Sequence, residues 1–172
     1  METWDVYDKD RNPTGKRMKR GDAFEQGAYH VVIHVCLFNP RGEMLIQQRQ
    51  PEKEHWKNMW DVTVGGSAIA GETSQQAAER EVKEEIGYDL NLGNIRPSLT
   101  VNFENGFDDY YLLESDVSIA ALKVPTEEVM QVRWGSQREI LGMIEEGTFI
   151  PYRPSLIEVL FDLRNDMGAV RK

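Results

Sequence analysis

The chain has 172 residues, enough for one domain with a substantial hydrophobic core and too few for two ordinary domains. Hydrophobic residues make up 40% and charged residues 28%, as in globular proteins, and no apolar run approaches the ~20 residues of a membrane span. A net charge of −9 argues against general nucleic-acid binding, and the single Cys36 fits a reducing cytoplasm. We expect one cytoplasmic domain over residues 1–172, with no nucleic-acid or membrane partner.

The first 27 residues predict a β-hairpin that extends a core of residues 28–172. Residues 3–8 alternate weakly in polarity, residues 10–15 are typical of a turn, and a second short strand follows. The basic run KRMKR, residues 16–20, has two interpretations. It is either a solvated strand edge, or a patch that meets substrate phosphates or a partner subunit.

The middle of the chain predicts a series of strands. Residues 30–38 (HVVIHVCLF) are nearly all apolar and β-branched, as in a strand buried on both faces, so His34 and Cys36 should pack in the core. A turn at 39–42 and a returning strand at 44–48 follow. Further strands are expected at residues 61–64, 96–103, 110–114 and 128–134, with a loop over 103–109.

Two helices are predicted near the end of the chain. Ser136 and Glu139 form a capping box, and Gly147 should end the helix that they open. Pro154 begins the last helix, in which one apolar stripe should pack on the core: Leu156, Val159, Leu160, Leu163 and Met167. Strands interleaved with helices indicate an α/β class.

A further helix lies within residues 66–88 and carries a cluster of carboxylates. Thr73 and Gln76 form a capping box at its start, and Gly87 should end it in a left-handed conformation. Three glutamates at i, i+3 and i+4 share one face and repel one another unless a cation lies among them: Glu81, Glu84 and Glu85. Apolar residues on the adjoining arc should dock the helix: Ala78, Val82 and Ile86. Carboxylate oxygens are ligands that suit Mg²⁺ or Mn²⁺.

This segment resembles the Nudix box, G-x5-E-x7-R-E-U-x-E-E-x-G-U, where U is a bulky apolar residue. The matching residues, all at the required spacing, are Gly66, Glu72, Arg80, Glu81, Val82, Glu84, Glu85 and Gly87. Only Tyr88 departs, since an aliphatic residue is usual there. The resemblance implies the Nudix fold, an α/β/α sandwich around a mixed sheet. It also suggests a homodimer, with the N-terminal hairpin as the exchanged element.

The resemblance further implies hydrolysis of a diphosphate linkage in a nucleoside diphosphate derivative or another organo-diphosphate, by attack of water on phosphorus. The implied ligands of the Mg²⁺ or Mn²⁺ ion are Glu81, Glu84, Glu85 and the backbone carbonyl of Gly65. Arg80 would orient a glutamate through a bidentate contact, and Glu72 would brace the loop against the helix.

Two parts of the implied site are less determined. The general base would be Glu81 or Glu85, or a carboxylate of a later loop; the later candidates are Glu104, Asp108 and Asp109. Arg49 and Lys53 are candidates for binding the substrate's phosphates. Trp56 and Trp60 have two interpretations, pocket wall or core.

A second, looser set of residues extends over positions 30–160: His30, Leu37-Phe38-Asn39, Gly42, residues 45–49, Lys53, Trp56, Trp60, residues 128–130, Trp134 and residues 149–152 (FIPY). With these residues the chain resembles the Nudix branch related to type 1 isopentenyl-diphosphate isomerase. That enzyme has a C-G-H-P-like segment where this chain has Gly65-Gly66-Ser67-Ala68. Its catalytic cysteine and metal-binding histidine are therefore missing, and His30, which matches a metal ligand in position, is expected to be structural. An isomerase of this type and a non-catalytic Nudix-like binding module remain as alternatives to the hydrolase.

Overall fold

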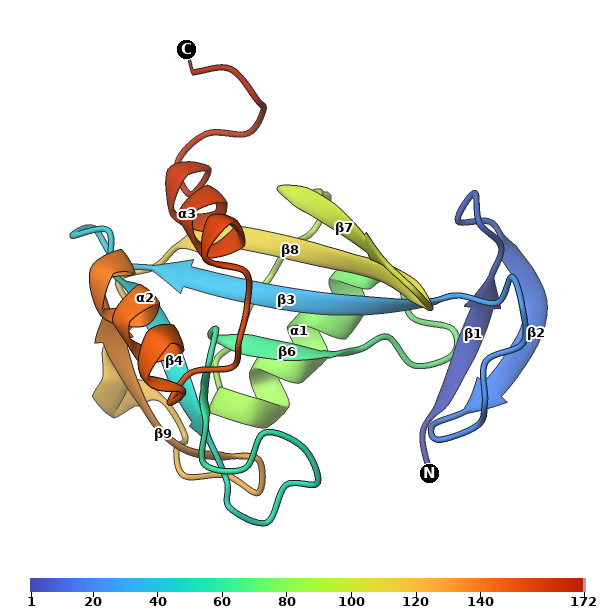
Figure 1. The fold of residues 1–172 in the computed structure, drawn as a ribbon, viewed down its shortest axis with the longest axis horizontal. Coiled ribbons are helices and arrows are strands. Elements are labelled where there is room, and N and C mark those ends of the chain that lie inside the picture. Colours follow the sequence, from blue (N-terminus) through green and yellow to red (C-terminus); the bar gives the residue numbers. More distant parts are fainter. Residues whose placement is uncertain (172) are drawn as a thin grey trace.

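The computed structural model describes residues 1–171, which form a two-stranded sheet, a seven-stranded sheet and three α-helices (Figure 1). The small sheet pairs β1 (Thr3–Tyr7) with β2 (Pro13–Lys19). The large sheet contains β3 (His30–Phe38), β4 (Met44–Arg49), β5 (Trp60–Asp61), β6 (Val64–Ser67), β7 (Leu99–Phe103), β8 (Gly106–Glu114) and β9 (Val129–Gly135). The helices are α1 (Ser74–Ile86), α2 (Gln137–Glu146) and α3 (Pro154–Asp162), and a 3-10 turn spans Ile119–Ala121.

The large sheet is mixed. Its main path runs β5-β4-β3-β8-β7, while β6 pairs with β3 and β9 pairs with β4. Strands β3 and β8 are parallel along their whole length, and the other pairs are antiparallel. Helix α1 covers one face, and α2 with α3 covers the other (Figure 1). The predicted α/β/α sandwich around a mixed sheet is therefore confirmed.

Strand β3 lies at the centre of the sandwich and is buried on both faces, as predicted. Its odd-numbered residues from Val31 to Leu37 pack with α1, whereas Cys36 and Phe38 pack with α2 and α3. This alternation follows from the two-residue period of a strand. Cys36 has no exposed surface and acts as a small hydrophobic residue, as expected.

The caps predicted for α1 and α2 are present. Thr73 accepts a hydrogen bond from the Gln76 amide while the Gln76 side chain accepts one from Thr73 N, and Gly87 has φ of 67°. Ala78, Val82 and Ile86 are fully buried against the sheet. Helix α2 begins with the reciprocal capping box predicted from its sequence and ends at a left-handed glycine.

The apolar stripe predicted for the last helix is confirmed only in part: Leu160 is buried and Leu156 and Leu163 pack against the core, but two of its residues do not. Helix α3 ends at Asp162, so Met167 lies beyond it, and Val159 is 41% exposed. Besides Leu160, the buried residues are Ile157 and Phe161, which the predicted stripe did not include. Phe161 packs edge-on against Phe38 with ring centroids 5.1 Å apart, and burying this large ring decides which face turns inward.

Two strand predictions also need correction. The strand expected at 61–64 is divided, because β5 pairs with β4 whereas β6 pairs with β3. Thr63 lies between them and its hydroxyl bonds to the backbones of both Leu37 and Leu45. The loop expected over 103–109 is a tight hairpin instead, since β8 already begins at Gly106.

The N-terminal hairpin predicted for residues 1–27 is present and packs on its own chain. Thr3 O accepts from Ala70 N at 2.7 Å, the Asp5 carboxylate accepts from Gly71 N at 2.6 Å, and Tyr7 pairs with Tyr29. These contacts join β1 to the loop before α1 and to the residue that precedes β3. No helix within residues 1–171 is long and apolar enough to cross a membrane.

Candidate active site

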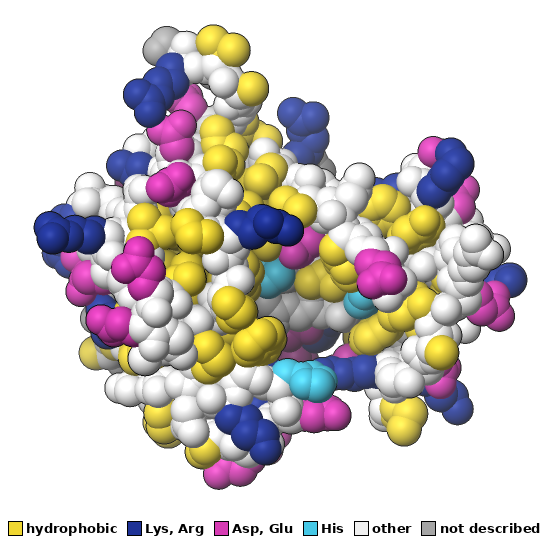
Figure 2. Space-filling model, in the orientation of Figure 1, with side chains coloured by type: hydrophobic (Ala, Val, Ile, Leu, Met, Phe, Trp, Pro, Cys, Tyr) yellow, Lys and Arg dark blue, Asp and Glu magenta, His cyan; other side chains and the backbone are white. Residues whose placement is uncertain are grey.

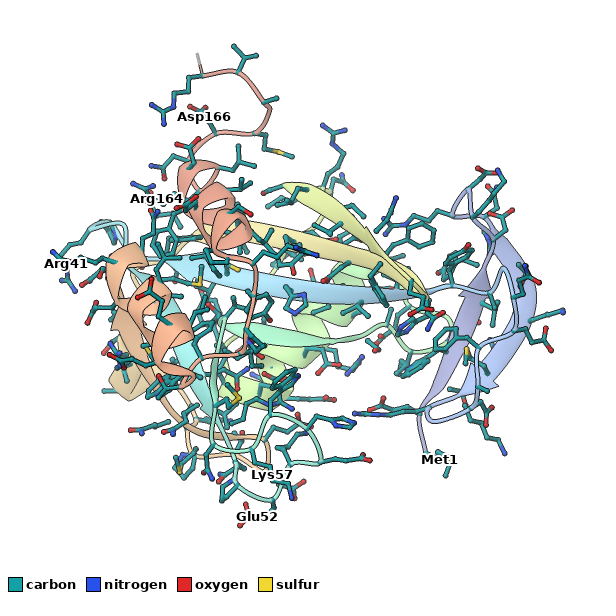
Figure 3. The ribbon with its side chains drawn as sticks, viewed as in Figure 1. Met1, Arg41, Glu52, Lys57, Arg164 and Asp166 are labelled. Carbon is teal, nitrogen blue, oxygen red and sulfur yellow. The ribbon has the colours of Figure 1, made fainter. Side chains whose placement is uncertain are left out.

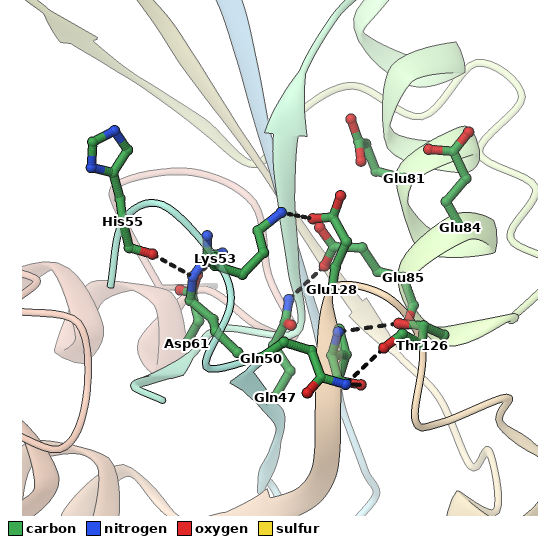
Figure 4. Close-up of polar contacts among 12 residues, drawn as sticks. Gln47, Gln50, Lys53, His55, Asp61, Glu81, Glu84, Glu85, Thr126 and Glu128 are labelled. Carbon is green, nitrogen blue, oxygen red and sulfur yellow. Dashed lines mark hydrogen bonds and ion pairs between the residues drawn. The ribbon is translucent and has the colours of Figure 1, made fainter. Parts of the chain in front are cut away.

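The three glutamates of α1 have different environments. Glu85 is 2% exposed and accepts a hydrogen bond at 2.5 Å from the Gln47 side chain of β4. The Glu81 side chain is 12% exposed, whereas that of Glu84 is 61% exposed. Figure 4 shows the three carboxylates along one side of the helix. The helix thus presents one buried, one half-buried and one solvated carboxylate.

Arg80 connects these carboxylates to the loop before the helix. Its guanidinium donates to both oxygens of Glu72, at 2.8 and 3.0 Å, and to the Ser67 carbonyl at 3.1 Å. It also donates to Glu81 at 2.9 Å and Glu84 at 3.2 Å. The bidentate contact expected of Arg80 therefore exists, and its partner is Glu72.

Glu72 lies where a brace between loop and helix would be needed. Besides binding Arg80, its carboxylate accepts from the backbone N–H of Ile69 at 3.0 Å. The loop of residues 67–72 is consequently tied to α1 through charge-assisted hydrogen bonds, which are stronger than neutral ones.

Gly65 and Gly66 have glycine because side chains approach their backbone closely. A Cβ at Gly66 would overlap the Glu81 carboxyl group, and a Cβ at Gly65 would lie 2.9 Å from the His34 ring. His34, predicted to pack in the core, is instead a 13% exposed side chain beneath Gly65 that bonds to Asp108 at 2.6 Å. β6 can therefore lie directly against the carboxylates of α1.

A pocket of about 180 Å³ opens beside this cluster. It is lined by Glu2, Trp4, Arg20, Arg49, Lys53, Gly65, Gly66, Ser67, Glu81 and Glu128. The structure thus brings together four residues predicted to belong to the site, Arg49, Lys53, Gly65 and Glu81. Lys53 points toward the Glu128 carboxylate, 2.7 Å away, beside the glutamates of α1 (Figure 4). Arg49 lies 3.9 Å from the buried Asp61.

The electrostatics of the cluster favour binding a cation. Burial raises the pKa of Glu81 to about 7, although Arg80 opposes the shift. Burial also raises the pKa of Glu85 well above its ordinary value, and the charges of Glu81 and Glu128 add to this. Each shift means that a further negative charge is costly at this place. A divalent cation would remove that cost.

The oxygen atoms of the cluster are of the kind that Mg²⁺ or Mn²⁺ binds, although their positions do not form a complete coordination shell. Carboxylate and carbonyl oxygens are what these ions prefer. Within residues 1–171, no three His, Cys, Asp or Glu side chains converge in metal-ligating geometry. Arg80 occupies one side of Glu81 and Glu84 instead, and the Glu84 side chain is mostly exposed to solvent.

Comparison with known proteins identifies the family. The model of the NUDIX domain family matches residues 28–154. The chain belongs to the Nudix family. It is 46% identical to an uncharacterized Nudix hydrolase of Listeria innocua over 96% of both chains. It is 33% identical to an isopentenyl-diphosphate Delta-isomerase of Pectobacterium atrosepticum, over 74% of this chain and 68% of that one.

The fold is also similar to that of a solved structure. A crystal structure from Deinococcus radiodurans superposes with a TM-score of 0.74 at 24% identity, covering 92% of this chain and 97% of the other. The Nudix box is thus the segment from Gly66 to Tyr88, which comprises the end of β6, the loop and α1. The carboxylates described above are those of the box.

The later-loop carboxylates proposed from the sequence do not line this pocket. Asp109 is fully buried and binds Arg11, Ser74 and Thr100, while Asp108 is engaged by His34. Glu104 is exposed in the turn between β7 and β8. The expected loop is largely the strand β8, in which each side chain is committed to one face, and the role of these carboxylates as general base stays a prediction.

Sequence reasoning missed Glu128, Gln47 and the hairpin residues of the pocket. Glu128 immediately precedes β9, whose pairing with β4 brings it to Lys53. The two residues are 75 positions apart, so only strand pairing could reveal the contact. Trp56 is 49% exposed and Trp60 packs beneath Arg133; neither lines the pocket.

Proposed function

We propose that this protein is a divalent-metal-dependent hydrolase that cleaves a diphosphate linkage in a nucleoside diphosphate derivative or another organo-diphosphate. The observation that carries the proposal is one pocket in which Glu81 of the box faces Arg49 and Lys53. Two cations suit the phosphates of a substrate, and the acidic cluster suits the metal that phosphoryl chemistry uses.

The proposed metal ligands are the carboxylates of Glu81, Glu84 and Glu85 and the carbonyl of Gly65. Bound there, Mg²⁺ or Mn²⁺ would neutralise phosphate charge and make a coordinated water more acidic. The net charge of −9 does not prevent an anionic substrate from binding, because such an ion reverses the local field.

The protein's own residues would then position and exchange protons. Arg80 holds Glu72 and Glu81 in fixed orientations, and Arg49 with Lys53 binds the phosphate oxygens. In the reaction, the oxygen of water forms a bond to phosphorus, the bridging P–O bond breaks, and the water proton passes to a carboxylate. We assign this role to Glu81 or Glu85, and Glu128, which lines the same pocket, is a further candidate.

The experiment is to measure phosphate and monophosphate release from a panel of diphosphates with Mg²⁺, with Mn²⁺ and with chelator. The panel includes nucleotide sugars, nucleoside triphosphates and prenyl diphosphates, and isopentenyl diphosphate is also assayed for isomerisation. We expect Glu84→Gln and Glu85→Gln each to reduce kcat/KM at least about 100-fold, as when a preorganised electrostatic group is removed.

The matched control is Glu145→Gln, an exposed glutamate on α2 far from the pocket in sequence and outside its lining. It should hydrolyse at the wild-type rate. Full activity in both box variants would refute the proposal. Isomerisation without hydrolysis would favour the isomerase instead, and binding without turnover would favour a binding module.

A further inference from the structure

The N-terminal hairpin forms part of the wall of the candidate active site. Glu2, Trp4 and Arg20 line the same pocket as Gly65, Gly66 and Glu81 of the box region. Figure 2 shows the surface hollowed between the hairpin, at the right, and the body of the molecule. Figure 3 labels Met1, at the start of the hairpin, and Lys57, in the loop between β4 and β5; both lie in the lower part of the view. The family model begins at residue 28, so the hairpin lies outside the segment that it matches.

The hairpin is fixed in place by its own contacts. Trp4 is 8% exposed and stacks on His30 of β3 with ring centroids 4.4 Å apart, and on Phe24 at 6.3 Å. β1 also bonds to the loop before α1 through Ala70 and Gly71. A wall held by packing and by hydrogen bonds at both ends presents its side chains to the pocket in a defined position.

Arg20 is the hairpin cation at this wall. Its backbone N–H donates to Glu2 O at 3.0 Å, and its guanidinium lies 3.1 Å from the Glu2 carboxylate. Both side chains are exposed, at 60% and 41%, so this ion pair contributes little to stability and its partner is readily exchanged. An anion entering the pocket can therefore replace Glu2 on Arg20.

The chemical character of the pocket indicates which substrates fit. Of its ten lining residues, Trp4 alone carries a large apolar side chain, and its ring is already committed to His30. A hydrocarbon group beside the diphosphate would gain little burial against apolar surface here. A group with oxygen acceptors would instead find the five N–H donors of a guanidinium.

We propose that the hairpin is the specificity wall of this site, and that Arg20 binds an anionic or oxygen-rich group attached to the diphosphate. This inference rests on the proposed diphosphate hydrolysis and specifies its substrate class: sugar or nucleoside diphosphate derivatives are favoured over prenyl diphosphates. Arg20 thus contributes specificity, whereas Arg49 and Lys53 bind the diphosphate itself.

The test compares Arg20→Gln with wild type on three probes: ADP-ribose, dimethylallyl diphosphate and methyl diphosphate. We expect Arg20→Gln to raise KM for ADP-ribose roughly 10-fold to 100-fold, the value of a charge-assisted hydrogen bond, with kcat nearly unchanged. Methyl diphosphate, which lacks a distal group, should be processed equally by both. Wild type should prefer ADP-ribose to dimethylallyl diphosphate.

The matched control is Arg17→Gln. Arg17 lies on β2, three residues before Arg20, and pairs with a carboxylate of β1, Asp5, at 3.1 Å, but it lies outside this pocket. It should leave all three KM values unchanged, and thermal melting of both variants checks that each is folded. Equal KM for ADP-ribose in Arg20→Gln and wild type, or a wild-type preference for dimethylallyl diphosphate, would overturn the inference.

Calorimetry with α,β-methylene-ADP separates this inference from the proposed function. If wild type hydrolyses nothing but binds this analogue, and Arg20→Gln binds it at least roughly 10-fold more weakly, hydrolysis is refuted and the role of Arg20 is supported. If wild type neither hydrolyses the probes nor binds the analogue, both are refuted.

Discussion

The imidazole of His30 lies among aromatic side chains where β3 meets the hairpin. It stacks on Trp4, contacts the edge of Phe103 at 5.7 Å between centroids, and is 7% exposed. Its Nδ1 has no hydrogen-bond partner among residues 1–171. Burial lowers the pKa of His30 to about 4, although the charge of Asp108 opposes this. These surroundings fit the structural role expected for His30.

His30 should therefore make the fold sensitive to acid. Between the folded pKa of about 4 and the ordinary value of 6.5, the unfolded chain binds more protons than the folded one, so stability falls as pH falls through this window. The loss approaches about 3 kcal/mol at pH 4. We expect His30→Phe to remove this component of the slope in denaturant unfolding measured from pH 7 to pH 4.

If the phenylalanine ring lowers the stability equally at every pH, the slope of stability against pH can still be compared between the variant and wild type. His55→Gln serves as the control, because the His55 side chain is 75% exposed and should not change the slope. If His30→Phe and wild type lost stability in parallel as the pH falls, His30 would not be the group responsible.

At the scale of elements, α1 combines local and tertiary determinants. Its ends are set by neighbouring residues, since Thr73 and Gln76 cap the first turn and Gly87 ends the last. Its orientation is set by packing of Val82 and Ile86 on the sheet. Glu81 then lies against Gly66, where the absence of a Cβ lets its carboxylate approach the backbone.

The cap of α1 should be measurable by itself. Replacing Thr73 with alanine removes the acceptor of the Gln76 N–H, which should destabilise the protein by about 1 kcal/mol. For a chain of this size, that is a decrease in Tm of roughly 2–4 °C. Thr73→Ser keeps the hydroxyl and should melt close to wild type. Identical melting of the alanine and serine variants would show that the cap contributes nothing.

At the scale of the whole molecule, one buried ion pair joins the hairpin to the large sheet. Arg11 lies in the turn between β1 and β2 and binds both oxygens of Asp109 on β8, which is fully buried. Ser74 and Thr100 also donate to this carboxylate, at 2.5 and 2.6 Å. Burial alone would raise the pKa of Asp109, but these hydrogen bonds outweigh it and lower the pKa.

Breaking this pair should loosen the hairpin and destabilise the fold. Arg11→Met leaves a buried carboxylate without its cation, a change that costs ~3–5 kcal/mol in fully buried pairs. Because Arg11 is 35% exposed and two hydroxyls remain on Asp109, we expect about 2 kcal/mol by denaturant unfolding. Since the folded pKa is lowered, the contribution of this pair is present at neutral pH and is lost in acid below the ordinary value of 3.8.

The double variant Arg11→Met/Asp109→Asn provides the comparison. It removes the unpaired charge and should recover part of the lost stability. A single Arg11→Met variant as stable as wild type would mean that the pair does not hold the hairpin.

Much of this protein is determined locally and was therefore readable from the sequence. Several features depend on residues within a few positions of one another: the caps of α1 and α2, the central strand β3, the hairpin and the spacing of the box glutamates. The hydrophobic period and the capping residues act over that range, so they predict the helices and strands. The spacing of the box residues is equally local, and it predicts the family.

What only the tertiary structure decided involves residues far apart in the chain. Pairing of β9 with β4 brings Glu128 to Lys53, and packing of Trp4 on His30 brings Arg20 to the pocket. The inward face of α3 was settled by the contact of Phe161 with Phe38. Such contacts depend on strand register and on competition for buried space, and neither leaves a periodic signal in a single sequence.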